Sequence, residues 1–487
     1  MIAILLNDAS FEQDIRELLM AFYPGETFTH KEEEAGEAEL IVRGVRDGNS
    51  FSLDVTPVKK EAVHFALIYP DFSNRFETKN EIKQTLYRLL SAQTGRELPW
   101  GTLTGIRPTK IALTKLYDGW TDEQIETYMR ETYFTSKEKI DLSIDVAERE
   151  RRLLSTIDYE NGYSLYVGIP FCPTTCLYCS FTSYPLVSWK NRVDAYLDAL
   201  EKEIDYTAAK FYHKHLNSIY IGGGTPTTLE PYQLDRLIRK IKCSFDLSDC
   251  LEFTVEAGRP DSITREKLEV LRKWGITRIS INPQTMQQRT LDLIGRRHSV
   301  EQTVESFKIA RELGFDDINM DLIMGLPEES LEDVRDTLEQ IMQLKPDNLT
   351  VHSLALKRAA RLNMFKEDYK DYKMVNTQEH MDLTASYAKK MDLFPYYLYR
   401  QKGMAGNLEN VGYAKEGKAG VYNILIMEEK QNIVACGAGA STKRVWNQPN
   451  PDGTHRIERC ENVKDVGQYI ERIDEMIERK QKLFAEE

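Results

Sequence analysis

The sequence is poor in the residues that build disulfide frameworks, membrane spans or basic nucleic-acid surfaces. Its 487 residues include only seven cysteines, an odd and small number that argues for reduced thiols rather than disulfides. No apolar run approaches the roughly 18 residues that a membrane span requires, so we expect no membrane span. Lys and Arg total 64 against 77 Asp and Glu, and this formal net charge of −13 argues against nucleic-acid binding.

A basic leader is also missing from the first residues, MIAILLNDASFEQD, which turn acidic after six apolar positions. This start predicts the first strand of a domain rather than a signal peptide, and a cytoplasmic protein. Because one hydrophobic core rarely grows beyond about 250–300 residues, the length predicts several domains. We expect a small α/β domain over 1–95, a helical connector over 96–158, a barrel over 159–365 and a C-terminal α+β subdomain over 366–487.

The first of these parts has the pattern of strand, helix and three further strands. MIAILL is followed by Ser10, a candidate N-cap with Gln13 three positions later, and then by apolar residues at helical spacing. AELIVRGV, SFSLDVTPV and HFALIYP are typical of strands, with RDGNS as a turn between the first two.

The helical connector is interrupted by LPWGTLTGIRPTK, residues 98–110, which is too rich in Gly, Pro and Thr for a helix. This loop carries Trp100, Arg107 and Lys110. Two interpretations stay open at this point: a plain linker between domains, or a segment that packs over a site and meets an anionic ligand.

Short β runs alternate with longer helical runs from about residue 160 onward. The six β runs are SLYVG, SIYIGG, LEFTVEA, RISIN, DINMDLI and NLTVHS, separated by enough residues for crossover helices. This alternation predicts a parallel sheet, and six units are too few for the eight of a closed TIM barrel, so we expect an open, partial TIM-type barrel. Beyond residue 365 we expect a helix NTQEHMDLTASYAKKM, a β-like VYNILIMEE and one closing helix KDVGQYIERIDEMIERKQKLF.

Three of the seven cysteines, Cys172, Cys176 and Cys179, lie within eight positions in the segment YVGIPFCPTTCLYCSF. A structural zinc site needs four N or S ligands, usually as two pairs, and no second pair or nearby histidine accompanies these. Thiolates also hold iron–sulfur clusters. Three cysteines would bind three irons of a four-iron cube and leave the fourth iron for another ligand. The plainer alternative is three cysteines without a shared role.

Chemically useful residues follow the predicted strands, where barrel enzymes gather their functional groups. A Gly222–Gly224 triplet follows the second strand and would let the backbone approach a ligand closely. Glu256 ends the third strand, Gln284 and then Arg296 follow the fourth, and Asp321 ends the fifth. Each alone is commonly a structural residue, but the set in this order predicts a cofactor site.

The segments together resemble oxygen-independent coproporphyrinogen III oxidase and its radical S-adenosylmethionine (SAM) relatives. The resemblance covers about 160–445 and rests on YVGIPFCPTTCLYCSF, IGGGTPT, VEAGRPD, INPQT, LIGRRHS and MDLIMGLP. The N-terminal domain and YYLYRQKGMAGNLENVGYA look closest to the HemZ-like subgroup. The resemblance implies a radical SAM barrel whose three cysteines hold a 4Fe-4S cluster, with SAM on the fourth iron and, as a family feature, two SAM molecules.

The resemblance also implies a set of SAM contacts along the chain. These are Tyr166, Tyr178, Gly223, Gly224, Thr225, Glu256, Gln284, Arg296, Asp321, Ala355 and Ser441.

The implied activity is the anaerobic oxidative decarboxylation of two propionate groups of coproporphyrinogen III, which gives protoporphyrinogen IX in haem biosynthesis. An electron donor such as flavodoxin or ferredoxin would reduce the cluster, and cleavage of SAM would supply the radical that removes a hydrogen from each propionate. A tetracarboxylate substrate also needs basic groups. The candidates are Arg259, Arg296, Arg297, Lys357 and Arg400.

Two positions depart from the oxidase motif. Gly168 stands where the motif Tyr-x-His-Ile-Pro-Phe-Cys has histidine, and Phe181 stands where the oxidase has an additional cysteine. An aromatic residue at 181 is similar to relatives that act as haem chaperones or as haem-opening methyltransferases. A haem chaperone without decarboxylase activity and a tetrapyrrole methyltransferase therefore stay open. His298 and His352 are the candidate axial haem ligands nearest the site, with a structural role as the alternative for each.

Overall fold

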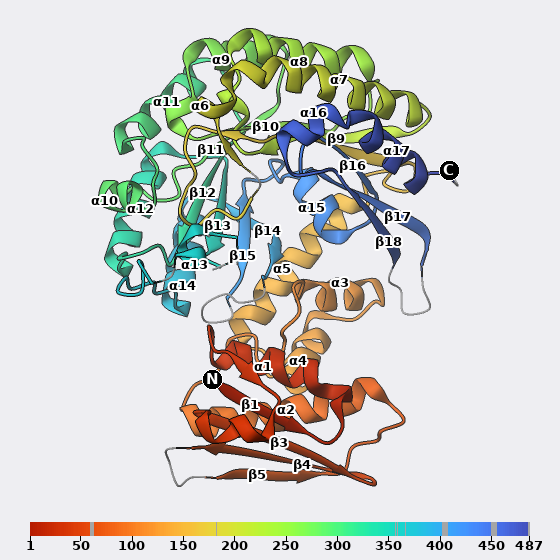
Figure 1. The fold of residues 1–487 in the computed structure, drawn as a ribbon, viewed down its shortest axis with the longest axis vertical. Helices are drawn as coiled ribbons and strands as arrows, with labels where there is room; N and C mark the ends of the chain where they lie inside the picture. The colour runs from red at the N-terminus through yellow and green to blue at the C-terminus, as the bar shows by residue number, and fades with distance from the viewer. Residues whose placement is uncertain are drawn as a thin grey trace.

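The computed structural model describes residues 1–58, 63–181, 183–355, 357, 359–365, 367–401, 408–449 and 455–485. Residues 402–407, within the segment that resembles the HemZ-like subgroup, lie outside the described residues. A small N-terminal unit lies at one end of the molecule, a group of helices connects it to the rest, and a large sheet with outer helices forms the other end (Figure 1). Among the described helices, none combines the length and apolar character needed to cross a membrane.

The N-terminal unit is a five-stranded sheet with helices on one face. Its strands lie in the order β2-β1-β3-β4-β5, and β1 is parallel to both of its neighbours. The bounds are β1 (Ile2–Leu6), η1 (Ala9–Phe11), α1 (Glu12–Phe22), β2 (Phe28–Thr29), η2 (Glu32–Glu37), β3 (Leu40–Asp47), β4 (Ser50–Pro57), β5 (His64–Ile68) and α2 (Arg75–Thr94). Alternate residues of β4 are buried, as expected for a sheet covered on one face.

The prediction that Ser10 caps the first helix is wrong. The capping side chain is Asp8, whose carboxylate accepts a hydrogen bond from the Ser10 N–H at 2.9 Å. Asp8 and Ser10 are equally good capping residues, and the chain begins its first turn two positions early as the 3-10 helix η1.

Three helices connect this unit to the large sheet: α3 (Thr109–Tyr117), α4 (Asp122–Tyr133) and α5 (Lys137–Leu154). The predicted loop lies between α2 and α3 and enters α3 at Thr109. Its Trp100 is fully buried and donates from Nε1 to Glu409 Oε2 at 2.7 Å. Lys139 of α5 donates to the other oxygen of Glu409. The loop is therefore held against the segment that precedes β15 (Asn410–Ala414), a strand of the large sheet.

The large sheet confirms the predicted partial barrel. Its six central strands are all parallel and match the six predicted β runs. They are β6 (Gly162–Ile169), β9 (His215–Gly223), β10 (Glu252–Gly258), β11 (Arg278–Ile281), β12 (Ile318–Met324) and β13 (Asn348–Ser353). The outer helices are α7 (Val193–Lys210), α8 (Pro231–Ser244), α9 (Arg265–Lys273), α10 (Gln288–Leu293), α11 (Val300–Glu312) and α12 (Leu331–Leu344).

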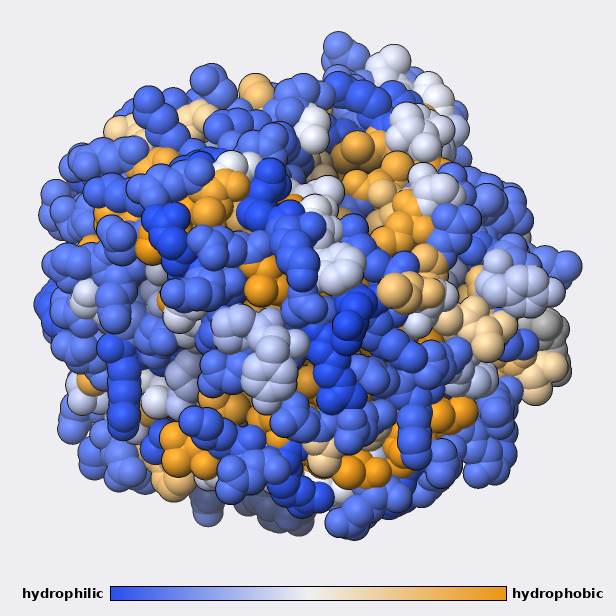
Figure 2. All heavy atoms as spheres, turned by 90° about the horizontal axis from the view of Figure 1, so that it is seen from above, coloured by the Kyte–Doolittle hydropathy of each residue, from blue (hydrophilic) through white to orange (hydrophobic). Residues whose placement is uncertain are grey.

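The outer helices bury one face and expose the other. Ser299 and Ser330 cap α11 and α12 with capping boxes, and Thr264 caps α9. Beneath them, strand residues such as Ile219 and Ile221 are fully buried, and each such side chain stabilises the fold by about 1.5–3 kcal/mol. The surface seen from above is mainly hydrophilic, with apolar side chains in small groups (Figure 2).

C-terminal strands extend both edges of the same sheet. Beyond β13 lie β15 (Asn410–Ala414) and β14 (Phe394–Tyr399), and beyond β6 lie β16 (Asn432–Cys436), β17 (Ser441–Pro449) and β18 (His455–Glu461). The sheet has eleven described strands in one open order, so the barrel is not closed. The remaining elements are β7 (Phe171–Cys172), β8 (Tyr184–Pro185), α6 (Leu186–Trp189), η3 (Lys190–Arg192), η4 (Pro226–Thr228), η5 (Pro260–Ser262), α13 (Arg361–Met364) and α14 (Gln378–Lys390). The four-part division of the chain stays a prediction.

Two predictions for the C-terminal part are wrong. VYNILIMEE forms a helix, α15 (Val421–Glu428), rather than a strand, because short apolar runs do not distinguish buried helices from strands. The predicted closing helix is divided at Arg472 into α16 (Val466–Glu471) and α17 (Ile473–Leu483). The predicted helix at NTQEHMDLTASYAKKM is confirmed as α14.

A buried ionic network joins α17 to the sheet. Lys480 and Glu203 of α7 form an ion pair whose side chains are 1% and 0% exposed. Glu203 also accepts hydrogen bonds from Tyr469 at 2.5 Å, from Asn462 at 2.7 Å and from the Gly437 N–H at 2.8 Å. The Glu203 carboxylate thus links two C-terminal helices, through Lys480 and Tyr469, to the turn after β16.

We predict that Lys480→Met lowers the free energy of unfolding by about 3–5 kcal/mol, because Glu203 is left as an unpaired buried charge. The matched control is Lys482→Met on the same helix, where the lysine side chain is 74% exposed and the expected change is below about 0.5 kcal/mol. Urea unfolding measures both values, and similar losses in the two variants would contradict a central role for the network.

Candidate iron–sulfur and cofactor site

The three clustered cysteines lie on a loop that leaves the end of β6. Cys172 and Cys176 are buried, Cys179 is partly buried, and all three are free thiols. The loop is held against the turn after α10: the Leu177 N–H donates to Ile294 O at 3.0 Å, and Thr174 Oγ1 donates to Gly295 O at 2.9 Å. The loop is therefore a fixed part of the sheet's carboxyl edge.

Arg259, just after β10, clamps this loop. Its guanidinium forms a bidentate pair with Asp261, at 3.0 and 2.6 Å. The remaining nitrogen, Nη1, donates to Thr174 Oγ1 at 2.7 Å and lies 3.7 Å from Cys176 Sγ. Thr225 Oγ1 donates to Cys172 Sγ at 3.6 Å. The backbone of Phe181 provides a hydrogen bond to Cys179, so all three sulfurs have donors, as suits thiolate ligands.

Burial raises the pKa of Cys172 above its usual range and raises the pKa of Cys179 to about 11. Both thiols are therefore neutral at pH 7, and binding iron would release their protons. Among the described residues, no three His, Cys, Asp or Glu side chains form a group that could hold a single metal ion. A cluster makes a different demand, since each cysteine binds a different iron. The donor set of this loop fits a 4Fe-4S cluster.

Glycines allow three strand ends to approach one another at this edge. The Gly224 N–H donates to Ile169 O at 2.7 Å, and a Cβ on Gly224 would lie only 2.6 Å from Phe171 O. Gly437 after β16 has φ +114°, and a Cβ there would lie 2.5 Å from Gly168 O. Any side chain at either position would push the neighbouring strand end away.

Glu256 of β10 faces the interior of the partial barrel. Tyr220 donates its hydroxyl to Glu256 Oε1 at 2.5 Å. Burial raises the pKa of Glu256 to about 7, against the lowering effect of this hydrogen bond. The tyrosine belongs to a stack with Tyr166 and Tyr422, whose rings lie 4.6–6.4 Å apart between centroids. An aromatic wall therefore adjoins the carboxyl group.

Gln284 follows β11 in a left-handed backbone conformation, with φ +70°. Its N–H donates to Asp321 O, and its carbonyl accepts from the Ile323 N–H, both at 2.9 Å. These two bonds to β12 hold a conformation that costs a non-glycine residue about 1 kcal/mol or more, and such strain concentrates at functional sites.

Asp321 itself is held ionised. Burial acts to raise its pKa, but hydrogen bonds from His352 and Asn319 bring the pKa below its usual value. The Asn319 amide lies 2.7 Å from Asp321 Oδ1, and His352 Nε2 lies 3.8 Å from Oδ2. Asp321 is therefore an anion at neutral pH, in contrast to Glu256.

Arg296 joins the cysteine loop to the end of β11. It is buried, and it donates to Tyr178 Oη at 3.0 Å and to Asn282 O at 2.6 Å. Ala355 is partly buried just beyond β13, at the same edge. Ser441 is exposed at the start of β17, where its backbone pairs with Glu461 of β18. None of the hydrogen bonds that join the cysteine loop to the strand ends involves Ser441. The assignment of all these residues to SAM stays a prediction.

The comparisons with known proteins agree with this geometry. Residues 166–341 match the family model of the Radical SAM superfamily. Over 438 residues the chain is 39% identical to the oxygen-independent coproporphyrinogen-III oxidase-like protein HemZ of Bacillus subtilis, covering 88% of this chain and 86% of the relative. The chain belongs to this oxidase-like family.

Two other known proteins match this chain over shorter segments. The heme chaperone HemW of Bacillus subtilis is 42% identical over 195 residues, 39% of this chain and 50% of that protein. The oxygen-independent coproporphyrinogen III oxidase of Escherichia coli is 33% identical over 224 residues, 46% and 48% of the two chains. The chain thus matches about half the length of each. The solved structure of the Escherichia coli oxidase HemN gives a TM-score of 0.51 at 25% identity, covering 67% of this chain and 73% of that chain.

The sequence did not reveal several residues that shape the site of this oxidase-like protein. Arg259 was expected only as a substrate-binding cation, yet its partners are Asp261 and the cysteine loop. Tyr220 was not singled out, although its place two positions before the glycine triplet was a usable signal. Tyr422 was hidden because its segment was assigned to a strand.

We predict that Arg259→Gln speeds the release of iron from the anaerobically reconstituted protein to a chelator by about ten-fold or more, because residues that orient metal ligands typically contribute 10–100-fold to affinity. Arg297→Gln is the matched control, since Arg297 is exposed next to the buried Arg296. Iron release followed by absorbance gives both rates. Equal rates in the two variants would show that the clamp has no effect on the cluster.

We also predict that Glu256→Gln changes the pH dependence of stability. The folded-state pKa of about 7 lies above the ordinary value of 4.5, so this group contributes stability that is complete below pH 4.5 and is lost as pH rises through 7. Between pH 5 and pH 8 the free energy of unfolding of the wild type should therefore fall by about 2 kcal/mol relative to that of the variant. This figure follows from about 1.4 kcal/mol per pKa unit, reduced because the carboxyl group is partly open to the barrel interior. Urea unfolding at both pH values measures the difference. The control is Glu269→Gln at an exposed position, which should show the same pH dependence of the free energy of unfolding as the wild type.

Proposed function

We propose that this protein is a radical SAM enzyme that decarboxylates two propionate groups of coproporphyrinogen III to give protoporphyrinogen IX. The observation that carries the proposal is the clamped loop with Cys172, Cys176 and Cys179 at the carboxyl edge of the sheet, near Glu256 of β10, Gln284 just after β11 and Asp321 of β12. When bound, the cluster and SAM would supply a carbon-centred radical that removes a hydrogen atom. The chain's own residues hold these groups in place and exclude water.

Within this proposal the three cysteines hold the cluster, and a row of residues at the strand ends binds SAM. Gly223 and Gly224 lie where a Cβ would meet the backbone at Ile169 and Phe171, so this glycine turn packs directly against the start of the cysteine loop. Thr225 Oγ1 lies 3.6 Å from Cys172 Sγ. Glu256, with a pKa of about 7, and the ionised Asp321 are acceptors for hydroxyl or ammonium groups. Tyr166, Tyr178, Gln284, Arg296, Ala355 and Ser441 complete the proposed set.

Substrate carboxylates need cations that are not already occupied by protein partners. Arg259 and Arg296 are buried and bonded to neighbouring protein groups, and buried Arg400 donates to Leu103 O at 2.7 Å. Lys357 is exposed, and its Nζ lies 5.9 Å from the centroid of the Phe181 ring. Phe181 is two residues after Cys179, the third cysteine. This pair of an ammonium group and a 71%-exposed ring suits a molecule with an aromatic body and carboxylate arms.

The likeness to HemW and the aromatic residue at 181 favour a second candidate, a haem chaperone without decarboxylase activity. The candidate axial ligands argue against it. His298 is fully buried, and burial lowers its pKa to about 3. His352 is engaged with Asp321, at 3.8 Å, and with the Tyr399 hydroxyl, at 3.5 Å. A tetrapyrrole methyltransferase is the third candidate. We further propose a cytoplasmic location and a small redox donor such as flavodoxin or ferredoxin.

We predict that the reconstituted protein, given SAM, a reductant and coproporphyrinogen III without oxygen, releases a product lighter by two carboxyl groups. Mass spectrometry of the tetrapyrroles measures the product, and the same samples report SAM cleavage. Cys176→Ala should abolish cluster absorbance and SAM cleavage together, because one of the three cluster ligands is removed.

The outcomes separate the candidates. SAM cleavage with stoichiometric haem binding and unchanged coproporphyrinogen would exclude the decarboxylase and support the chaperone, and transfer of a methyl group would support the methyltransferase. SAM cleavage that survives in Cys176→Ala would contradict the assignment of the cluster itself.

A further inference from the structure

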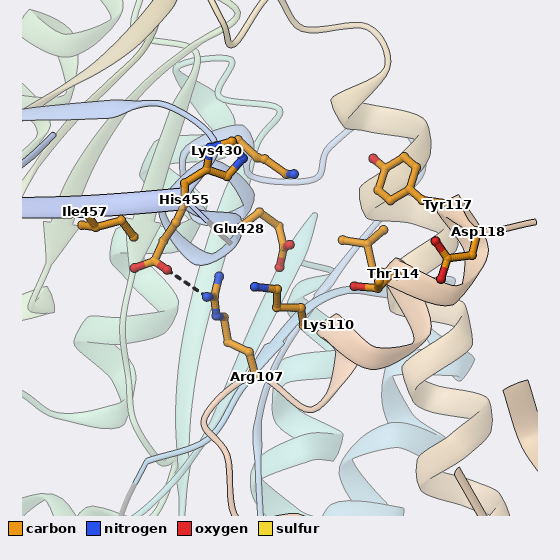
Figure 3. Close-up of a pocket in the computed structure, with 11 residues that line it drawn as sticks. Arg107, Lys110, Thr114, Tyr117, Asp118, Glu428, Lys430, His455 and Ile457 are labelled. Atoms are coloured by element: carbon orange, nitrogen blue, oxygen red, sulfur yellow. Dashed lines mark hydrogen bonds and ion pairs between the residues drawn. The ribbon is translucent and has the colours of Figure 1, made fainter. Parts of the chain in front are cut away.

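A polar cavity lies away from the cysteine loop, between the helical connector and the edge of the large sheet. Its volume is about 280 Å³, near the lower end of the range for small-molecule sites. The walls come from the loop before α3, from α3 itself, from the end of α15 and from β18. Segments about 320 residues apart thus build one pocket (Figure 3).

Basic side chains surround this cavity in a chain whose net charge is −13. Arg107 reaches across the junction and pairs with Glu429 at 2.8 Å. Lys443, at 3.1 Å, and Arg459, at 3.4 Å, pair with the same carboxylate, so Glu429 is fully neutralised. Asp118 lies 3.7 Å from Lys115. These two acidic residues of the wall already have cationic partners.

Two lysines of the wall remain without such partners. The side-chain ammonium groups of Lys110 and Lys430 form no ion pair or hydrogen bond with any residue that the structure describes. Figure 3 shows Glu428 between Lys430 on one side and Arg107 with Lys110 on the other, and the Tyr117 hydroxyl facing the same space. Thr114 adds a second hydroxyl to the wall. The cavity therefore offers several hydrogen-bond donors and two ammonium groups that have no direct ion-pair partner among the described residues, with Glu428 as the nearest unpaired carboxyl group of the wall.

Glu428 does not cancel this positive charge in full. Its side chain and that of Glu150 on α5 are both buried, and Glu150 Oε2 has no hydrogen-bond donor among the described residues. Burial raises the pKa of both carboxyl groups, and repulsion from Glu428 raises the pKa of Glu150 further. Arg107, Lys430 and Lys110 act in the opposite direction on Glu428, but its pKa stays above the ordinary value. The pair therefore retains a proton more readily than exposed carboxyl groups, and a protonated carboxyl group is a further donor.

We propose that this cavity binds a small oxyanion, the carboxylate or phosphate group of a metabolite, held between Lys110 and Lys430. The half-enclosed position strengthens charge-assisted hydrogen bonds relative to those on an open surface. A bound anion would join α3 of the connector to the end of α15, which packs on β9 and β14 of the barrel. This site is separate from the cysteine loop, and the proposal does not depend on the proposed activity.

Isothermal titration calorimetry of the full chain tests the proposal, with inorganic phosphate and citrate as separate probes at constant ionic strength in chloride. We expect saturable binding of at least one probe to the wild type. The double variant Lys110→Met, Lys430→Met should weaken that binding at least ten-fold, since each lost ammonium removes a charge-assisted hydrogen bond. Lys308→Met, a change of an exposed lysine on α11, should leave it unaltered.

Binding of phosphate alone would identify a phosphate site, and binding of citrate alone a carboxylate site. Absence of saturable binding by both probes, or equal affinity in the double variant, would overturn the proposal. The thermal midpoint of each variant without ligand checks folding. If the double variant does not fold, the single change Lys430→Met gives the same comparison, with at least a several-fold loss expected.

Discussion

Strand β6 and its two parallel neighbours set the position of everything else at the site. β6 pairs with β9 along one edge and with β16 along the other, so the ends of all three strands meet at the exit of the cysteine loop. The approach is so close that a Cβ at Gly437 would collide with Gly168 O of β6, and a Cβ at Gly224 with Phe171 O just after β6. Any change in this pairing would move the cysteine loop and the glycine turns together.

The C-terminal helices are part of this same arrangement. Glu203 on α7 holds the Gly437 N–H, while Lys480 of α17 neutralises its charge in the protein interior. Tyr196 of α7 also links β6 to the turn after β16, because its hydroxyl donates to Gly168 O at 2.6 Å and accepts from the Ala438 N–H at 3.1 Å. A helix nearly 300 residues after the cysteines therefore supports the strand from which they emerge.

The sequence predicted what depends on local pattern and missed what depends on contacts between distant segments. All six central strands could be predicted, because buried parallel strands alternate with crossover helices in the chain itself. The helical state of α15 could not, since eight mainly apolar residues fit a strand or a helix equally well. The clamp of Arg259 on Thr174 joins positions 85 apart, and no local spacing indicates which arginine turns inward. Ser441 was placed at the site by resemblance alone; it is exposed at the start of β17, and its assignment stays a prediction.

The two departures from the oxidase motif, Gly168 and Phe181, have different physical surroundings. Gly168 lies inside the fold, where a Cβ would stand 3.3 Å from the ring of Tyr166 and 3.5 Å from Cys436 O. A larger side chain there would extend beside the tyrosine stack that adjoins Glu256. Phe181 lies outside, 71% exposed, next to Lys357. The glycine at 168 therefore keeps the backbone close to the tyrosine stack, whereas Phe181 contributes to the exposed surface, so a change at one position need not affect the other.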